Sequence, residues 1–366
     1  MAIACGIVGL PNVGKSTIFN ALTSAKAEAA NYPFCTIEPN TGMVKVPDTR
    51  LAKIAELIPP QKLIPATMSF VDIAGLVKGA SKGEGLGNQF LGHIRETNAI
   101  AHVVRCFSDS NVIHVDGSVD PLRDISVIDT ELILADLETV TKKFSSTQKA
   151  AKAGDKRAAA QMGVLDPVKS ALESGKPVRA MNLNHEELAL IDDFHLITAK
   201  KVMYVANVDD KDIAHPESNP YFSKLVEYAK KEGSPVVPIC GKIESEISEL
   251  DEAEKAEFLK DMGMAEPGLN RVIRAGYEIL GLETYFTAGD IEVRAWTIEK
   301  GWRAPQAAGV IHTDFEKGFI RAEVYHYNDL IKYKSEQAIR DAGALKVEGK
   351  EYVVKDGDIM HFRFNV

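Results

Sequence analysis

The fold of this chain is decided by the stretch Gly9-Leu10-Pro11-Asn12-Val13-Gly14-Lys15-Ser16. It matches G-x-x-x-x-G-K-[ST], the pattern of a phosphate-binding P-loop. An apolar run at residues 2–8 precedes it and predicts a buried strand, and residues 17–24 carry apolar side chains at helical spacing. Strand, glycine-rich loop and helix in this order are the setting that the motif requires. The sequence therefore predicts a nucleotide-binding domain of the α/β class.

Each part of this loop has a chemical role. Gly9 and Gly14 allow the backbone to bring its N–H groups onto phosphate oxygens, and the following helix N-terminus adds partial positive charge. Lys15 is expected to act in catalysis by reaching the β- and γ-phosphates, and the Ser16 hydroxyl is expected to bind Mg²⁺.

Composition excludes several classes of protein. The 366 residues allow two domains, and the net charge of −9 means that contact with RNA would need a local basic patch. The four cysteines are scattered, which argues against a disulfide framework or a zinc site. No apolar run approaches the roughly 20 residues that span a bilayer, and no secretory leader is recognisable. We expect a cytoplasmic protein, a monomer, with no membrane partner.

A second motif follows at the end of the apolar run 66–71. It reads Asp72-Ile73-Ala74-Gly75, a D-x-x-G. Asp72 is expected to hold Mg²⁺ through water, and the Gly75 N–H to meet the γ-phosphate. Upstream, Thr36 lies in a proline-rich loop, where it either completes the Mg²⁺ shell or is a solvated hydroxyl. Downstream, His114 is either a catalytic, water-positioning imidazole or a partly buried structural histidine.

The pattern of residue types changes between residues 129 and 199. Apolar residues recur at helical spacing on both sides of Gly154, which predicts a helical hairpin inserted into the nucleotide domain. The basic residues near its tip either contact RNA or belong to a solvated helical face; they are Lys142, Lys143, Lys149, Lys152, Lys156 and Arg157.

Base recognition is predicted after the strand at residues 201–206. GTPases carry N-K-x-D there, and this chain reads Asn207-Val208-Asp209-Asp210. A further strand, residues 236–239, leads to Cys240-Gly241-Lys242, where guanine binders usually show Ser-Ala-Lys. The choice of base is therefore open at this point.

The C-terminal part has a different pattern. Residues 271–281 and 328–342 are predicted to be helical, and residues 292–298, 319–324, 351–354 and 359–364 to be strands. A small mixed sheet with one helix, of the β-grasp kind, fits this pattern. We expect domains at residues 1–280 and 281–366, the second serving as a binding module.

Taken together, these stretches resemble the Obg-like ATPase family, the YchF proteins. The resemblance covers essentially the whole chain and is most specific at residues 6–17, 31–40, 70–91 and 285–366, the last being similar to that family's TGS domain. It implies a Ras-like domain with a helical insertion, ATP preferred over GTP, and a role on the ribosome, at the large or small subunit and its rRNA, in translation or stress control. Leu76 matches the subgroup in which a hydrophobic residue replaces the catalytic glutamine.

The resemblance also assigns residues. It gives Mg²⁺ to Ser16 and Thr36, adenine to the backbone of Val208, and the phosphates to Asn12, Val13, Gly14, Lys15, Ser16 and Thr17. Asn207 is also expected to belong to the nucleotide-binding residues. P-loop proteins that lack the glutamine sometimes use K⁺, and Asn12 resembles the asparagine that holds it. Where this chain has Asp210 the family often has Glu, which keeps GTP use open. The predicted function is a Mg²⁺-dependent ATPase; the alternatives are a GTPase of the Obg type and a nucleotide-gated ribosome-binding module with little turnover.

Overall fold

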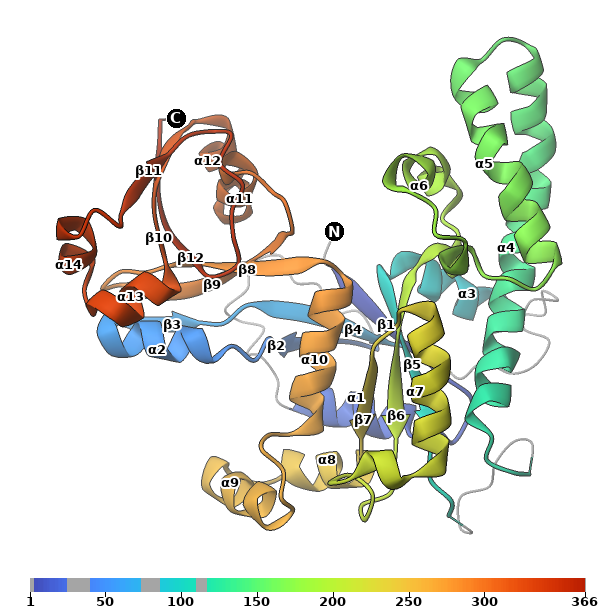
Figure 1. Cartoon of the computed structure of the whole chain (residues 1–366), viewed down its shortest axis with the longest axis horizontal. Helices are drawn as coiled ribbons and strands as arrows, with labels where there is room; N and C mark the ends of the chain where they lie inside the picture. The colour runs from blue at the N-terminus through green and yellow to red at the C-terminus, as the bar shows by residue number, and fades with distance from the viewer. Residues whose placement is uncertain (1–2, 25–39, 74–85, 110–116, 366) are drawn as a thin grey trace. The chain divides into compact units, whose positions relative to one another are not determined.

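The computed structural model describes residues 3–24, 40–73, 86–109 and 117–365. The chain forms two compact units (Figure 1). Unit 1 comprises Met1–Gly42 and Ser69–Gly276, and unit 2 comprises Met43–Met68 and Tyr277–Val366. The sequence predicted a single boundary near residue 280. The structure also assigns residues 43–68 to the C-terminal unit.

Unit 1 is built on a sheet in the order β2-β4-β1-β5-β6-β7. Strand β1 (Ala4–Val8) pairs in parallel with β4 (Thr67–Asp72) on one side and with β5 (Ala99–Arg105) on the other. Beyond β5 the sheet continues with β6 (Lys201–Asn207) and β7 (Val236–Ile239), and each of these strands is parallel to its neighbour. Every residue of β5 is buried, as expected for a parallel strand covered on both faces. The outer strand is β2 (Thr41–Lys45).

Helices follow these strands. The P-loop lies at the carboxyl end of β1, between this strand and the first helix. α1 (Lys15–Ser24) packs against β1 and against α8 (Gly241–Ser248), while α7 (Pro220–Glu232) packs against β6, β7 and the base of α4. Unit 1 also contains α3 (Leu86–Glu96) and α9 (Glu252–Asp261), and α10 (Gly268–Ile279) leads out of it. The predicted Ras-like architecture is confirmed.

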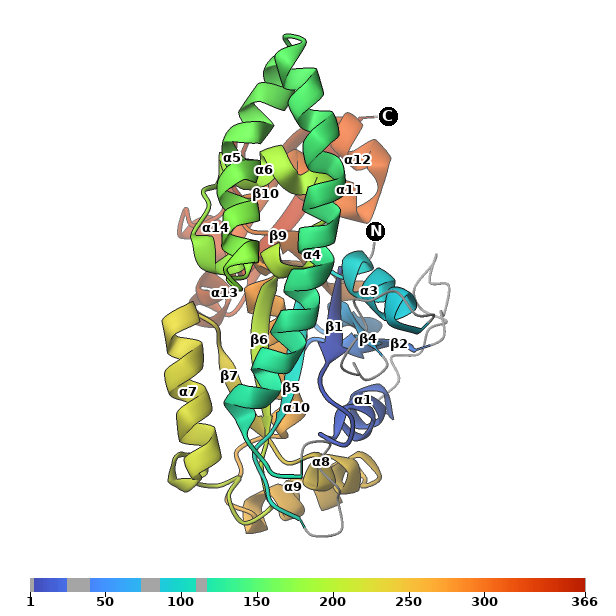
Figure 2. The same ribbon diagram turned by 90° about the vertical axis from the view of Figure 1, so that its right-hand side faces the viewer.

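The helical hairpin is α4 (Pro121–Lys152) followed by α5 (Lys156–Glu173), which extend side by side beyond the sheet (Figure 2). Asp120 and Asp155 cap the two helices by accepting backbone N–H bonds. Gly154, in the turn, has φ 96°, a conformation that glycine adopts without strain. The hairpin was predicted from residue 129, but the first helix begins at Pro121, where proline fits the first turn.

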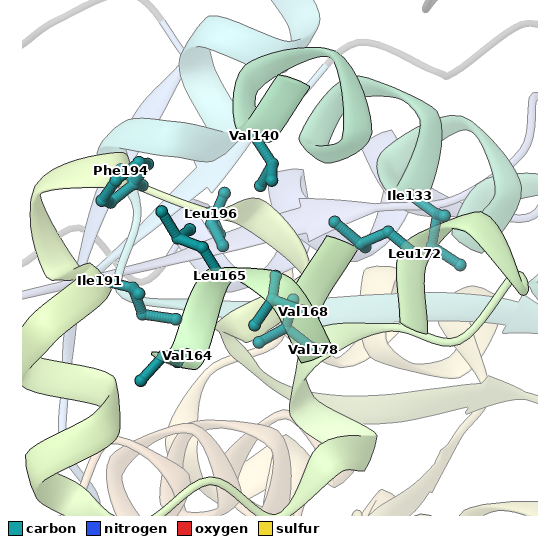
Figure 3. Packing of buried hydrophobic residues seen from close by; sticks show 10 residues of the cluster. All are labelled: Ile133, Val140, Val164, Leu165, Val168, Leu172, Val178, Ile191, Phe194 and Leu196. Atoms are coloured by element: carbon teal, nitrogen blue, oxygen red, sulfur yellow. The ribbon is translucent and has the colours of Figure 1, made fainter. Parts of the chain in front are cut away.

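The hairpin has its own apolar core, in which side chains from α4, α5 and the returning segment interlock (Figure 3). The returning segment consists of η3 (Val178–Met181), α6 (His185–Ile191), η4 (Asp192–Phe194) and η5 (Ile197–Ala199). Asp136 of α4 is fully buried, and its carboxylate accepts hydrogen bonds from the backbone of Ile197 and Thr198 and from the Thr198 hydroxyl at 2.7–2.9 Å. These contacts fix the return of the chain into β6.

Unit 2 is built on a mixed sheet in the order β11-β10-β12-β8-β9-β3. The strands are β8 (Leu282–Thr287), β9 (Glu292–Glu299), β10 (Phe319–His326), β11 (Lys346–Glu348) and β12 (Asp358–Phe364). β12 runs parallel to β8 and antiparallel to β10, and α11 (Ala304–Ile311) packs against β9 and β10. α12 (Thr313–Lys317) follows α11. The mixed β-grasp sheet was predicted, but with one helix; α11 and α12 were not predicted.

Two local predictions for unit 2 were wrong. Residues 351–354 do not form a strand, because only an isolated bridge joins Val353 to Arg303. The helix predicted at 328–342 is two helices, α13 (Tyr327–Tyr333) and α14 (Glu336–Asp341), interrupted at Lys334, whose φ of 67° is left-handed.

The segment 43–68 is an integral part of unit 2. Its strand β3 (Lys62–Ile64) adds to the sheet beside β9, and its helix α2 (Thr49–Leu57) packs against β9 and α13. Arg50 is held at 2.7 Å from Asp48 and at 2.6 Å from Asp356, which also accepts the Thr284 N–H. We call this set, Asp48, Arg50 and Asp356, the Arg50 clamp.

Candidate nucleotide-binding site

The P-loop geometry explains why its second glycine is required. Gly14 has φ 99°, and a Cβ atom at this position would lie 2.3 Å from Nδ2 of Asn207. Any larger residue would therefore be strained and would also collide with a buried side chain. Asn12 adopts a left-handed φ of 62°, which asparagine tolerates better than most residues. Val13 is buried beneath the loop, while Asn12, Ser16 and Thr17 are exposed on its outer surface.

Lys15 is the buried cation of the loop. Its side chain is 7% exposed, and Nζ donates a 2.7 Å hydrogen bond to the carbonyl oxygen of Leu10. Burial lowers its pKa to about 8, and the charge of Asp72 partly opposes that shift. A poorly solvated ammonium gains more than a solvated one from an anionic partner, which is the property that phosphate binding needs.

Asp72 is the last residue of β4, and one of its carboxylate oxygens is buried. Oδ1 is buried and has no hydrogen-bond partner among the residues that the structure describes. Burial raises the pKa of this carboxyl, while the charge of Lys15 lowers it. A buried, unsatisfied carboxylate oxygen near a P-loop lysine fits Mg²⁺, which takes one or two protein oxygens together with phosphates and water. Ser16, at the start of α1, offers an exposed hydroxyl for the same ion.

Asn207 joins the P-loop to the first residue of α8. Its Nδ2 donates to the Val13 carbonyl oxygen at 2.9 Å, and its Oδ1 accepts the Gly241 N–H at 3.0 Å. The side chain is 5% exposed and lines the pocket described next. We interpret Asn207 as a positioning residue that aligns the two walls of the site.

A pocket of about 640 Å³ opens beside the P-loop. Asn12, Gly14 and Thr17 line one part of it. The rest is formed by the carboxyl ends of β5, β6 and β7 and by the start of α8, through Phe107, Asp109, Asn207, Val208, Asp209, Asp210, Cys240, Gly241, Lys242, Ser245 and Glu246. The structure thus brings the P-loop and the Asn207–Asp210 stretch to one pocket.

Two polar groups in this pocket are already engaged. The Val208 N–H donates to the Ile239 carbonyl oxygen at 2.8 Å, so the carbonyl oxygen is the backbone atom that Val208 offers to a base. The Asp210 carboxylate lies 3.1 Å from Nζ of Lys242. Hydrogen bonds from Asp209 and from Lys242 lower the pKa of Asp210.

Phe107 is a pocket residue that the sequence analysis did not identify. Its ring is half-buried, and the Arg105 guanidinium lies 4.5 Å from the ring centroid. Arg105 also donates to the Phe107 carbonyl oxygen at 3.1 Å. An aromatic residue two positions after the end of a fully buried strand was the available signal, because the carboxyl ends of parallel strands carry ligand sites.

Three predicted site residues lie outside the described residues: Thr36, Gly75 and His114. Within the described ranges, no three His, Cys, Asp or Glu side chains gather to hold a metal ion. Nor do those ranges contain a helix with the length and apolar character needed to cross a bilayer.

The basic residues of the hairpin fall into two groups. Lys142 pairs with Glu138, Lys143 donates to the Asp193 carbonyl oxygen at 2.9 Å, and Arg157 lies 3.8 Å from the Asp193 carboxylate. The other three are exposed, and no ion pair joins them to any residue between 117 and 365; they are Lys149, Lys152 and Lys156. We call these three the tip lysines.

Comparisons with known proteins agree with this geometry. The family described as 50S ribosome-binding GTPase matches residues 4–136, and the YchF GTPase C-terminal family, described as a protein of unknown function, matches residues 282–365. Proteins named ribosome-binding ATPase YchF from Escherichia coli O157:H7, Haemophilus influenzae and Bacillus subtilis are 59%, 58% and 55% identical, each over the whole of both chains.

A solved structure is similar along almost the whole chain. The Schizosaccharomyces pombe YchF GTPase has 42% identity and a TM-score of 0.88, covering 99% of this chain and 97% of its own. The P-loop unit, its helical hairpin and the β-grasp unit therefore recur together in one protein, and the chain belongs to the YchF family.

Proposed function

We propose that this protein is a ribosome-binding ATPase, which binds and hydrolyses ATP and uses the nucleotide to switch its association with the ribosome in the cytoplasm. The single observation that carries the proposal is the convergence of the P-loop and the Asn207–Asp210 stretch on one pocket. The names of the curated relatives support both the nucleotide and the partner.

The described residues of the site have separate roles. The backbone around Gly14 and the ammonium of Lys15 hold the phosphates, and Thr17 lines the pocket beside them. Ser16 and Asp72 supply oxygens for Mg²⁺, which neutralises phosphate charge when bound. Asn207 keeps the P-loop aligned with the opposite wall. Thr36 as a Mg²⁺ ligand, Gly75 at the γ-phosphate, His114 as a water-positioning group and K⁺ beside Asn12 belong to the same proposal.

Adenine is favoured over guanine by position 208. Guanine binders place a lysine there, whose stem covers the base, whereas Val208 is 2% exposed and offers only its carbonyl oxygen. Phe107 adds an apolar ring surface, which any base can stack on.

The nucleotide part is tested by Lys15→Ala in the full chain. The variant removes the buried cation of the P-loop, so ATP binding by calorimetry should be lost while the protein remains folded. Thr23→Ala, at the other end of α1, is a suitable control, because the hydrogen bonds that the described residues give its hydroxyl lie within that helix. Normal ATP hydrolysis by Lys15→Ala would refute the site.

The ribosome part rests on two local basic features of an acidic chain. The first is the set of tip lysines, exposed at the end of the hairpin. The second lies in unit 2, where Arg321 of β10 is directly opposite Arg363 of β12. Arg363 also lies 3.4 Å from the Glu323 carboxylate, so the exposed Arg321 is the charge that this face offers to an anionic partner such as rRNA phosphate.

Reversal of the tip lysines tests the first surface. Glu at all three positions should weaken ribosome co-sedimentation, and wild-type binding should fall as salt rises. A matched control reverses three exposed lysines of α7, Lys224, Lys230 and Lys231, which changes the charge equally. Equal binding by the two triple variants would show that the hairpin tip is not a contact surface.

A further inference from the structure

The nucleotide pocket has a second polar end, away from the P-loop. Because the P-loop binds the phosphates, the base of a bound nucleotide extends towards the opposite wall. That wall carries Val208, Asp210 and Lys242, all of which line the same pocket. These side chains are therefore placed to meet the base, which is the part that distinguishes ATP from GTP.

Asp210 does not face the pocket as a bare carboxylate. Nζ of Lys242 lies 3.1 Å from its Oδ2. The two side chains are 44% and 70% exposed, so a ligand can reach both. The pair also forms part of the wall of a neighbouring cavity of about 310 Å³, beside Phe258 and Met262 of the α9 region.

The two bases require different partners at this position. Guanine presents two donors, N1–H and the 2-amino group, to which a bare carboxylate is complementary. Adenine presents a lone pair at N1, which a bare carboxylate repels. An ammonium carries three donors, so Lys242 can bond to Asp210 and still offer a proton to an acceptor.

We propose that Lys242 is a specificity-determining residue that adapts the Asp210 carboxylate to adenine. Its ammonium remains between Asp210 and N1 of adenine, and guanine has to displace it. This inference rests on the proposed ATP binding and adds a reason for the choice of base that Val208 alone does not supply.

The ion pair adds little to the free energy of folding, so its effect on base recognition can be measured separately. Ion pairs this exposed contribute little to folding stability. Substitution of Lys242 should therefore change base preference without unfolding unit 1.

The test compares Lys242→Met with Lys242→Arg and Lys211→Met in the full chain. Lys211 is exposed and lines the neighbouring cavity but not the nucleotide pocket, so Lys211→Met matches the loss of charge at a nearby position. Calorimetry is run with ATP, GTP and 1-deaza-ATP, in which carbon replaces N1.

In Lys242→Met, the ratio of ATP to GTP affinity should fall by about tenfold, through weaker ATP and tighter GTP binding, as loss of a hydrogen bond from a charged donor predicts. The wild type should bind ATP more tightly than 1-deaza-ATP, and this difference should vanish in Lys242→Met. Lys242→Arg should retain the preference, and Lys211→Met should behave as the wild type.

Two results would overturn the inference. One is an unchanged ATP to GTP ratio in Lys242→Met. The other is an equal loss of both nucleotides, which would assign Lys242 to a part that they share. Failure of the proposed function is distinguishable, because the wild type itself would then not bind ATP.

Discussion

Asn207→Ala tests how much the alignment of the two pocket walls contributes to ATP binding, apart from direct contacts with the nucleotide. The substitution removes two buried hydrogen bonds, one to the Val13 carbonyl oxygen and one from the Gly241 N–H. Each buried backbone group left without a partner costs about 1–3 kcal/mol, and water entering beside the pocket recovers part of that. A net loss of about 2 kcal/mol in ATP binding corresponds to a Kd about thirtyfold weaker.

Two measurements test this estimate. Calorimetry gives the Kd for ATP, and hydrogen exchange gives the protection of the Gly241 amide, which donates to Asn207. Gln161→Ala is the matched control, because this buried amide also bonds to a backbone carbonyl, that of Leu190, but within the hairpin. The reasoning is refuted if the Kd of Asn207→Ala changes less than threefold while Gly241 loses its protection.

Other parts of the molecule give further predictions. Asp72→Asn should weaken the binding of Mg²⁺ that supports ATP binding, seen as a higher Mg²⁺ concentration at half-saturation. An unchanged value would show that Asp72 does not belong to the metal site. Arg50→Ala should expose amides of unit 2 to hydrogen exchange while unit 1 stays protected, because both partners of Arg50 lie in unit 2. Burial alone would raise the pKa of Asp356, but hydrogen bonds from Arg50 and from the Thr284 N–H hold it below its usual range. Its contribution to stability is therefore complete above about pH 4 and is lost as the pH falls through the lowered pKa. Hydrogen exchange of unit 2 between pH 5 and 3 should show this loss in the wild type and a smaller one in Asp356→Asn.

The elements around the P-loop could be predicted from sequence because their signals are local. Gly14 needs its left-handed φ, Lys15 and Ser16 follow at fixed spacing, and β1 is apolar throughout. The hairpin was predictable for the same reason, since its core repeats at helical spacing around Gly154.

The features that escaped prediction depend on residues far apart in the chain. β3 is three residues long and has two exposed positions, so only its pairing with β9 makes it a strand. The pair of Asp210 with Lys242 joins the loop after β6 to the first turn of α8, and the motif at each place resembles a guanine-binding pattern. Asn207 was assigned to the nucleotide by its motif, whereas its hydrogen bonds within the protein could be seen only in three dimensions.

The placement of residues 43–68 in unit 2 has a consequence for synthesis on the ribosome. Lys62 of β3 pairs with Glu292 of β9, so the edge strand emerges long before the strand that it joins. The chain also runs through both units in the order one, two, one, two. Unit 2 therefore cannot close until the C-terminal segment has been translated, and until then β3 lacks its partner β9 and presents an unpaired edge to the growing chain. Folding of the nascent protein should accordingly finish late, after release of its last strand, rather than domain by domain from the N-terminus.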